Sequence, residues 1–324
     1  MSWLFGGGKK TRGETIVVLD VENGSVGAGL VRLVPGALPK LFAQTRVPMP
    51  LARTRSAASL VRAAEVAALE ALQHTSLVAA RVRHSKLHTL GDVSRAVVFL
   101  HAPWSTLAST KRSWNHEPEM VHGLRVALAS TFGDIPATFR PFSTAALHTT
   151  NTLFEQQGSF LLCTITGEMA ELLLVKDGNL EGRATIPLGS NLALRTLQSH
   201  TGMSQAEARS ALLLAHDAPT LYPEPLSAAA NHFSAAFRDA AREILDTPVT
   251  GVLIIGTEPG GTWAAKTLSV ASPPSTVPDP FAEDTVVRTL NARHIAPYIA
   301  AHAHSPDIAL MVATVFVASK INEV

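Results

Sequence analysis

The chain has 324 residues, of which 46% are hydrophobic and 16% charged, and its formal net charge at pH 7 is +1. This length and composition allow a large core and favour two lobes, and the balanced charge argues against a nucleic-acid partner. The one cysteine, Cys163, excludes an internal disulfide, and its apolar neighbours predict a buried thiol.

The first residues place an apolar triplet, Trp3, Leu4 and Phe5, ahead of a glycine hinge and three basic residues. A signal peptide has the opposite order, basic residues first and a longer apolar stretch after them. We therefore expect the chain to stay cytoplasmic, and a membrane contact through the triplet would place it at the inner face of the cytoplasmic membrane. Residues 1–13 are expected to form a flexible tail, either frayed or in peripheral contact with a membrane through the triplet.

Residues 16–33 predict a β-hairpin in which a buried strand ends at Asp20 and a second strand returns after Asn23-Gly24. Asparagine and glycine tolerate the positive φ that such turns require. An acidic residue at the end of a buried strand, followed by a turn with free N–H groups, suits a phosphate and its metal ion. Asp20 is therefore a candidate Mg²⁺ ligand, with a purely structural hairpin as the alternative.

The rest of the first half alternates strands and helices. Residues 57–74 predict a helix, because one stripe along it is apolar and the other faces carry charge. The other expected elements are strands at 38–47 and 95–101, a further strand within 105–114, a helix at 117–131, a strand following residues 135–136 and a helix at 141–152.

The second half repeats this alternation. A strand pair spans 160–180 around a Gly167-Glu168 turn, and Ser204 is a predicted helix N-cap. A helix at 308–319 is apolar but too short to span a membrane. The other expected elements are a strand, a glycine and a helix at 185–197, a long helix at 226–245, and a buried strand, a glycine-rich loop and a helix at 251–268.

The segments 16–33, 160–180, 185–197 and 251–268, in this order, resemble the actin-like ATPase superfamily, in particular its PilM/FtsA-like branch. The resemblance implies an α/β, two-lobed, ribonuclease H-like fold. Residues 14–150 would form the first lobe, with an inserted subdomain reduced to about 104–135. Residues 151–324 would form the second lobe, with the C-terminal helix returning to the first.

The resemblance also implies a site for ATP and Mg²⁺ between the lobes. Asp20 matches the metal carboxylate, and it is a catalytic candidate together with Glu168, which is otherwise a solvated turn residue. The positions that match the nucleotide site are Asp20, Asn23, Gly24, Ser25, Thr164, Gly167, Gly189, Gly256, Thr257 and Gly260.

Several of these positions depart from the family pattern. Thr164 stands in place of a second carboxylate, Glu22 in place of a glycine and Gly27 in place of a lysine. Arg209 stands where relatives carry a ribose-binding glutamate, and Glu258 lies within a loop that is otherwise rich in glycine. Losing several charged partners costs roughly 2–5 kcal/mol each, so we expect ATP and Mg²⁺ to bind weakly or not at all.

The fold and these departures together favour a scaffold or adaptor of a bacterial envelope machine, such as a PilM-like component of type IV pilus assembly. The expected partners are an inner-membrane assembly protein or its cytoplasmic peptide, and a second copy of the chain. The alternative is an active ATPase of the same superfamily, an FtsA-like filament former or a small-molecule kinase.

Overall fold

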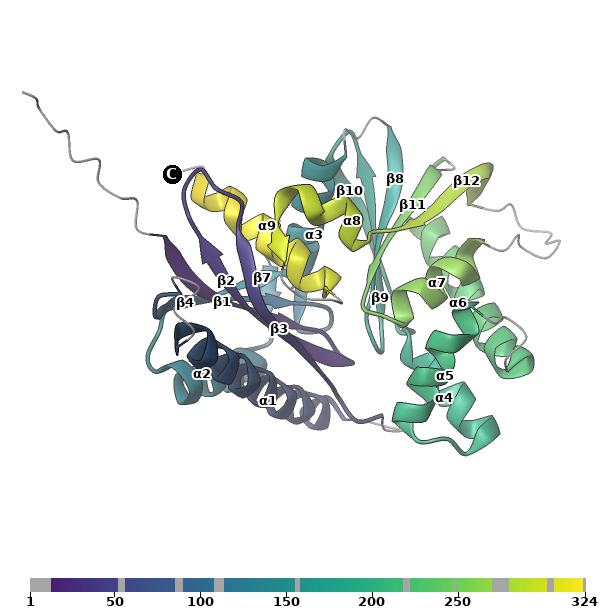
Figure 1. The fold of residues 1–324 in the computed structure, drawn as a ribbon. Helices are drawn as coiled ribbons and strands as arrows, with labels where there is room; N and C mark the ends of the chain where they lie inside the picture. Colours follow the sequence, from purple (N-terminus) through teal and green to yellow (C-terminus); the bar gives the residue numbers. More distant parts are fainter. Residues whose placement is uncertain are drawn as a thin grey trace, which may run out of the picture.

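The computed structural model describes residues 13–51, 56–84, 90–107, 114–154, 158–217, 222–247, 249–269, 280–301 and 306–322. The chain folds into two α/β lobes, each built around one large sheet (Figure 1). The predicted α/β class is confirmed. The triplet Trp3, Leu4 and Phe5 lies outside the described residues.

The first sheet is built from the N-terminal half and one short late strand. Its order is β13-β3-β2-β1-β4-β7, antiparallel within β1, β2 and β3 and parallel from β1 through β4 to β7. The strands are β1 (Glu14–Val21), β2 (Ser25–Leu33), β3 (Lys40–Pro48), β4 (Val93–Leu100), β7 (Ala137–Pro141) and β13 (Ala300–Ala301).

Two helices, α1 (Ala57–His84) and α2 (Pro118–Phe132), cover one face of this sheet. The predicted stripe of α1 is buried there, as expected. The helix is ten residues longer than the predicted 57–74, because Ala79 is buried as well and Thr75 donates a hydrogen bond to the Ala71 carbonyl (2.8 Å). Packing against the sheet thus continues the helix beyond the stripe that its sequence shows.

The expected strand within 105–114 is two short strands instead. β5 (Ser105–Leu107) pairs antiparallel with β6 (Trp114–His116), and residues 108–113 between them lie outside the described part. The guanidinium of Arg183 lies 5.0 Å from the centre of the Trp114 ring, so this hairpin touches the second lobe.

The second sheet has the order β10-β9-β8-β11-β12. Burial in its central strand raises the pKa of Cys163, and the nearby charge of Glu171 adds to the effect, as expected for an unreactive buried thiol. The strands are β8 (Ser159–Ile165), β9 (Ala170–Lys176), β10 (Asn179–Ile186), β11 (Val249–Gly256) and β12 (Phe281–Thr289). The helices packed on its outer face are α4 (Asn191–Thr201), α5 (Gln205–Asp217), α6 (Pro223–Ile244) and α7 (Gly260–Ser269).

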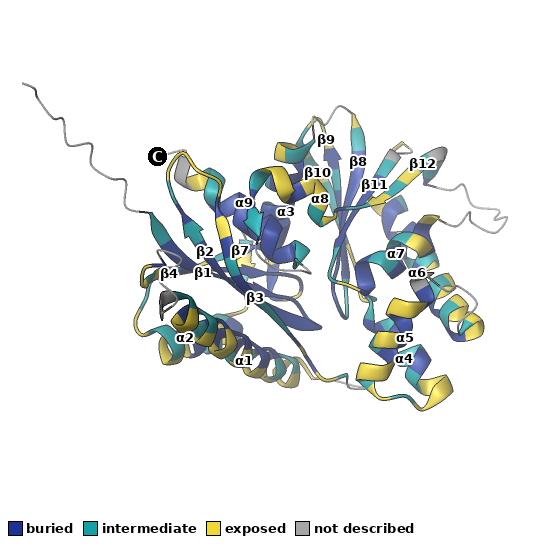
Figure 2. Cartoon of the chain, viewed as in Figure 1, coloured by how far each residue is buried: buried dark blue, intermediate teal, exposed yellow. Residues whose placement is uncertain are grey.

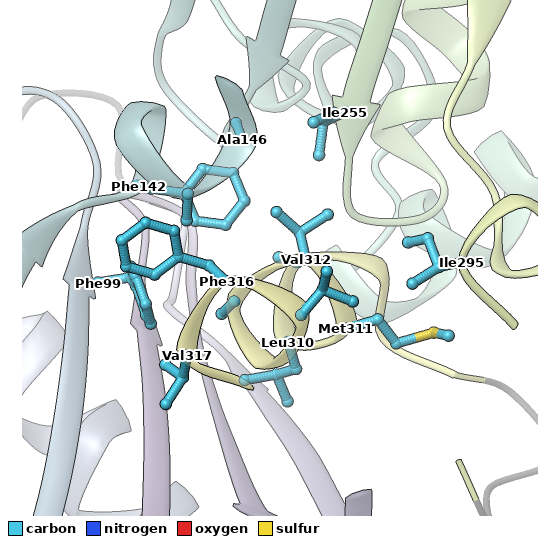
Figure 3. Packing of buried hydrophobic residues seen from close by; sticks show 14 of the residues in the cluster. Phe99, Phe142, Ala146, Ile255, Ile295, Leu310, Met311, Val312, Phe316 and Val317 are labelled. Carbon is cyan, nitrogen blue, oxygen red and sulfur yellow. The ribbon is translucent and has the colours of Figure 1, made fainter. Parts of the chain in front are cut away.

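A layer of helices lies between the two sheets and joins their cores. It contains α3 (Phe142–Leu153), α8 (Ala292–Ile295), the 3-10 turn η1 (Ala296–Tyr298) and α9 (Ile308–Asn322). Figure 3 shows α9 in the middle of this cluster, with Phe99 and Phe142 on one side and Ile255 and Ile295 on the other. This surrounds α9 with apolar partners and explains why its sequence is apolar on every face.

Exposure follows the same layering. Figure 2 shows buried central strands and middle helices, with exposed residues gathered on the outward faces of α1, α4 and α5. Within the described ranges, every helix is either too short or too polar to cross a lipid bilayer.

Candidate functional site

Three residues form a row across neighbouring strands of the first sheet, close to where the lobes meet. Asp20 of β1 lies opposite Gly27 of β2, and Gly27 lies opposite Arg46 of β3. Adjacent strands are about 4.8 Å apart, so two strand spacings separate the backbones of Asp20 and Arg46. An arginine side chain is long enough to cross this gap, provided that the middle residue has no side chain in its path.

Gly27 leaves this path open. A Cβ at Gly27 would lie 2.6 Å from Nη2 of Arg46, closer than real Cβ contacts come. The resemblance placed a phosphate-facing lysine at this position in many relatives. Here the glycine admits a cation from the next strand instead.

Arg46 is surrounded by carboxylates. Its Nη2 lies 2.7 Å from Asp20 Oδ2, and its Nε lies 2.6 Å from Asp307 Oδ2. Its Nη1 lies 3.1 Å from Glu22 Oε1 and donates to the Ser25 hydroxyl at 2.8 Å. Burial alone would lower the pKa of Arg46, but the charges of Asp307, Asp20 and Glu22 outweigh it and raise the pKa well above the usual value. The guanidinium is therefore a permanent internal cation.

Asp20 has no exposed surface and uses both carboxylate oxygens. Oδ2 accepts from Arg46, and Oδ1 lies 2.8 Å from Nε2 of His101, whose ring stacks on Phe142. Burial alone would raise the pKa of Asp20, but the charges and hydrogen bonds of His101 and Arg46 outweigh it and lower the pKa. The predicted metal carboxylate is thus ionised and already paired.

Asp307 connects this cluster to the C-terminal helix. Its Oδ1 accepts from the backbone N–H of Leu310 at 3.0 Å, which caps the first turn of α9. Its own N–H donates to the side-chain oxygen of Gln44 at 3.0 Å. The ion pair with Arg46 therefore holds the start of α9 against β3.

Glu22 links the two lobes. Its Oε1 accepts a hydrogen bond from the hydroxyl group of Ser25 in its own lobe. It also accepts one, at 3.1 Å, from the hydroxyl group of Thr257 in the glycine-rich loop of the second lobe. Arg209 lies close enough to interact electrostatically with this network. Burial lowers the pKa of Arg209, the negative charge of Glu22 raises it, and the positive charge of Arg46 lowers it further. The glutamate that stands in place of the family's glycine thus contributes to an interlobe network.

The two predicted hairpin turns touch each other. Asn23 Nδ2 donates to the Ala102 carbonyl at 2.9 Å, and its Oδ1 accepts from the backbone N–H of Glu168 at 2.6 Å. A Cβ at Gly24 would lie 2.6 Å from Cα of Gly167. The turns meet backbone to backbone, and the N–H of Glu168 that faces the cleft already has an acceptor.

A second polar contact joins the lobes at α5. The side chain of Gln205, on α5, donates to the Met49 carbonyl and accepts from the N–H of Leu51, both at 2.9 Å. A single amide side chain thereby pairs two backbone groups of the segment that follows β3. The lobes are held together by side chains at both hairpins and at α5.

Glu168 is not the solvated turn residue given as its alternative role. Its Oε1 accepts from Nδ2 of Asn191 at 2.8 Å and lies 2.5 Å from Nη2 of Arg195, both on α4. The carboxylate is therefore paired with side chains of α4 in its own lobe. Thr164 lies buried in β8, where its hydroxyl brings no charge to the cleft.

The predicted glycines of the second lobe are required by close packing. A Cβ on Gly189 would overlap the Thr166 carbonyl, and a Cβ on Gly260 would overlap Ser190. A Cβ on Gly256 would lie 2.9 Å from a backbone carbon of α7. Close packing within the second lobe therefore accounts for these glycines without a bound nucleotide.

A pocket of about 450 Å³ remains beside the glycine-rich loop, framed by α5, α6 and α7. Glu258 lies on its rim, next to the Thr257 that contacts Glu22, and its backbone carbonyl accepts from Arg209 Nη1 at 3.4 Å. Its size and apolar walls are typical of a small-molecule pocket. The apolar lining includes Leu212, Leu213, Leu226, Pro259 and Trp263.

Comparisons with known proteins identify the fold. The sequence matches no protein-family model and no curated protein. In structure, the chain is similar to a chain of a PilM-PilN type IV pilus biogenesis complex, with a TM-score of 0.60, 13% identity, and coverage of 94% of this chain and 98% of that one. It is also similar to the ethanolamine utilization protein EutJ from Carboxydothermus hydrogenoformans, with a TM-score of 0.54, 10% identity, and coverage of 93% and 90%.

The chain has the actin-like ATPase fold. The resemblance inferred from four short segments is thereby confirmed for the fold. In this actin-like chain, Asp20, Asn23, Gly24, Ser25, Gly167 and Thr257 come together where the lobes meet. Glu168 lies at the same junction, but its carboxylate is held by α4.

Three residues of the actin-like cleft were not anticipated from the sequence: Arg46, His101 and Asp307. Each contacts Asp20 or its partner from a distant part of the chain. The one available signal was Gly27, since a small residue where a lysine is expected leaves space for another cation. Within the described residues, no group of three or more histidine, cysteine, aspartate or glutamate side chains is arranged to hold a metal ion.

Proposed function

We propose that this chain is a scaffold or adaptor of a bacterial envelope machine, a PilM-like component of type IV pilus assembly that does not hydrolyse ATP efficiently. Its similarity to a chain from a PilM-PilN complex extends over nearly the whole length of both proteins. Because fold does not determine function, the proposal rests on the site rather than on the similarity alone.

The observation that carries the proposal is the position of Arg46. Mg²⁺ takes carboxylate and water oxygens in octahedral geometry, and nucleotide phosphates supply further oxygens. Here both oxygens of Asp20 are already engaged, and a permanent cation lies against them. The residues present do not fit a magnesium-phosphate group, so a nucleotide would have to break three buried ion pairs to reach Asp20.

The contacts between the lobes support the same role. In an actin-like protein, a nucleotide in the cleft would bridge the lobes. In this chain Asn23, Glu22 and Gln205 make that connection directly. A fixed arrangement of lobes suits a protein whose task is to present surfaces to partners at all times.

The proposal implies that ATP with Mg²⁺ binds in the high-micromolar range or more weakly, about −5 kcal/mol or less favourable. Thermal unfolding with and without millimolar ATP and Mg²⁺ tests this. Saturation at about 100 times the dissociation constant would stabilise the fold by about 2.7 kcal/mol, so the expected result is no clear rise in Tm.

A rise of several degrees that disappears in Asp20→Ala would overturn the nucleotide part of the proposal. Magnesium-dependent phosphate release that also requires Asp20 would favour the alternative, an active FtsA-like filament former or small-molecule kinase. For either outcome Arg46 would have to move away from Asp20.

The adaptor role is tested by affinity purification of the tagged chain from its native bacterium. We expect an inner-membrane assembly protein, or a fragment carrying its cytoplasmic peptide, to co-purify, and sizing of the purified chain tests association with a second copy. The proposed location is the inner face of the cytoplasmic membrane, with Trp3, Leu4 and Phe5 as a peripheral contact. Repeated recovery of no inner-membrane assembly component would contradict the role.

A further inference from the structure

A groove of about 580 Å³ lies on the first lobe, where α3 and α9 pack near strands β4 and β7. It shares no lining residue with the Arg46 cluster or with the pocket beside the glycine-rich loop. The strands contribute alternate residues, Arg95 and Val97 from β4 and Thr138 and Arg140 from β7, so these side chains line the same face of the sheet.

The groove combines an apolar floor with a cationic rim. Val97, Phe316 and Val317 form part of the floor, and Figure 3 shows Phe316 and Val317 on α9 beside the first sheet. Arg140 and Lys320 are exposed at the rim. Among the residues that the structure describes, no aspartate or glutamate belongs to the lining.

The distribution of counter-charges distinguishes the two arginines. Arg95 is held by Glu14, with Nε 2.9 Å from Oε1 and Nη2 3.1 Å from Oε2. Arg140 has no carboxylate within ion-pair distance among the described residues. The positive charge of Arg140 also acts on a neighbouring residue: the pKa of His116 is lowered mainly by burial and further by the charge of Arg140. An acidic group at this rim would therefore gain an uncompensated cation.

We propose that this groove docks an acidic, extended peptide segment of a partner protein. A carboxylate of the segment would meet Arg140, and a neighbouring apolar side chain would rest on the floor formed by Phe316 and Val317. Alternation of acidic and apolar residues suits a groove whose cations stand above an apolar base. The groove is concave, so a peptide can enter it where a flat membrane surface cannot. The inference rests on the proposed adaptor function, since an adaptor requires such a partner.

Fluorescence anisotropy tests the charge requirement directly. The probe is a short fluorescein-labelled peptide of alternating glutamate and leucine, compared with the same peptide carrying glutamine in place of glutamate. We expect the acidic peptide to bind the intact chain at least about tenfold more tightly, which corresponds to about 1.4 kcal/mol, and to weaken as salt is added. Equal binding of the two peptides, or no binding of the acidic one, overturns the proposal.

Variants locate the binding site. Arg140→Glu should weaken binding of the acidic peptide at least about tenfold, whereas Arg62→Glu, which reverses an exposed cation on α1, should leave it unchanged. Thermal unfolding of both variants checks the fold, and Arg140→Gln replaces Arg140→Glu if the charge reversal prevents folding. Equal losses of peptide affinity in the Arg140 and Arg62 variants would contradict the proposal. Binding of the chain to anionic phospholipid vesicles that depends on Arg140 and is not inhibited by the acidic peptide would contradict it as well.

The same variants separate this inference from the adaptor role. If the intact chain and Arg140→Glu recover an inner-membrane assembly protein equally well, the groove proposal is wrong and the adaptor role stands. If no such protein is recovered while the acidic peptide still binds through Arg140, the adaptor role is wrong and the groove remains a peptide site.

Discussion

The junction between the lobes and the pocket beside the glycine-rich loop of the second lobe differ in how they are filled. On the side of the two hairpins, Arg46 and its three carboxylates fill the site, and Gly24 lies against Gly167. On the side of the glycine-rich loop, a pocket of about 450 Å³ remains open between α5, α6 and α7. The junction is closed by charge pairing within the protein, whereas the second lobe keeps a cavity beside the loop.

The difference follows from the cost of leaving each kind of site empty. A buried carboxylate without a counter-ion is strongly unfavourable, so Asp20 requires a cation from a metal ion or from the chain. Apolar walls such as Trp263 and Leu212 have no such requirement, and a cavity that they line can stay open at modest cost. Asp20, the residue that best matches a metal ligand of a nucleotide site, is thus the one for which the protein itself supplies the cation.

The largest expected effect comes from removing that partner. Arg46→Ala leaves Asp20, Glu22 and Asp307 without their shared cation, and breaking buried pairs in this way costs about 3–5 kcal/mol. Urea unfolding measures the loss, and Arg62→Ala on the exposed face of α1 should stay within about 0.5 kcal/mol of the parent chain.

Magnesium sharpens this prediction. Millimolar Mg²⁺ should raise the Tm of Arg46→Ala but not that of the parent, because only in the variant have Asp20, Glu22 and Asp307 lost their shared cation. If Arg46→Ala is too unstable to purify, Arg46→Lys keeps the charge and should be intermediate in stability. An Arg46→Ala protein as stable as the parent would show that the carboxylates do not depend on this cation.

A smaller effect is expected where the hairpins meet. Gly167→Ala places a methyl group against Gly24, and such overpacking costs about 1–3 kcal/mol. Small-angle scattering should show a larger radius of gyration as the lobes separate. Gly251→Ala is the matched control, since a Cβ there makes an ordinary 3.6 Å contact with Phe160. Equal behaviour of both variants would mean that the turns do not hold the lobes.

At the start of α5, in the second lobe, the expected change is about 1 kcal/mol. Ser204 caps α5, because its hydroxyl accepts from the Glu207 N–H at 3.3 Å while Glu207 Oε2 accepts from the Ser204 N–H at 2.8 Å. Ser204→Ala should lower the free energy of unfolding by about that amount. Ser210→Ala, at an exposed position of the same helix, should raise it by up to about 0.5 kcal/mol.

The smallest effect on stability at neutral pH comes from the titration of Asp20, because this titration takes place only in acid. Its folded-state pKa lies below the unfolded value of about 3.9. Its contribution to stability is therefore complete above that unfolded value and is lost as pH falls through the lower folded value. Unfolding free energies measured from neutral pH into acid should show this loss, and Asp20→Asn should lack that component. An identical acid slope in both proteins would contradict the assignment.

The sequence by itself determined the local elements and was enough to predict the fold. The hairpin at 16–33, the strand pair at 160–180 and the apolar stripe of α1 were predicted because each pattern repeats within one short segment. Asp20 at the end of a buried strand and Ser204 ahead of a helix were visible for the same reason. The extra length of α1 was missed because it depends on packing against the first sheet.

Only the tertiary structure decided what Asp20 contacts. Arg46 is 26 positions from Asp20 and 261 from Asp307, and His101 is 81 positions from Asp20. These side chains meet because β1, β2 and β3 pair in one register and because α9 returns to the first sheet. Periodicity reports which face of a segment is buried, but the cation that compensates a buried carboxylate depends on which strands are neighbours and on the space that Gly27 leaves between them.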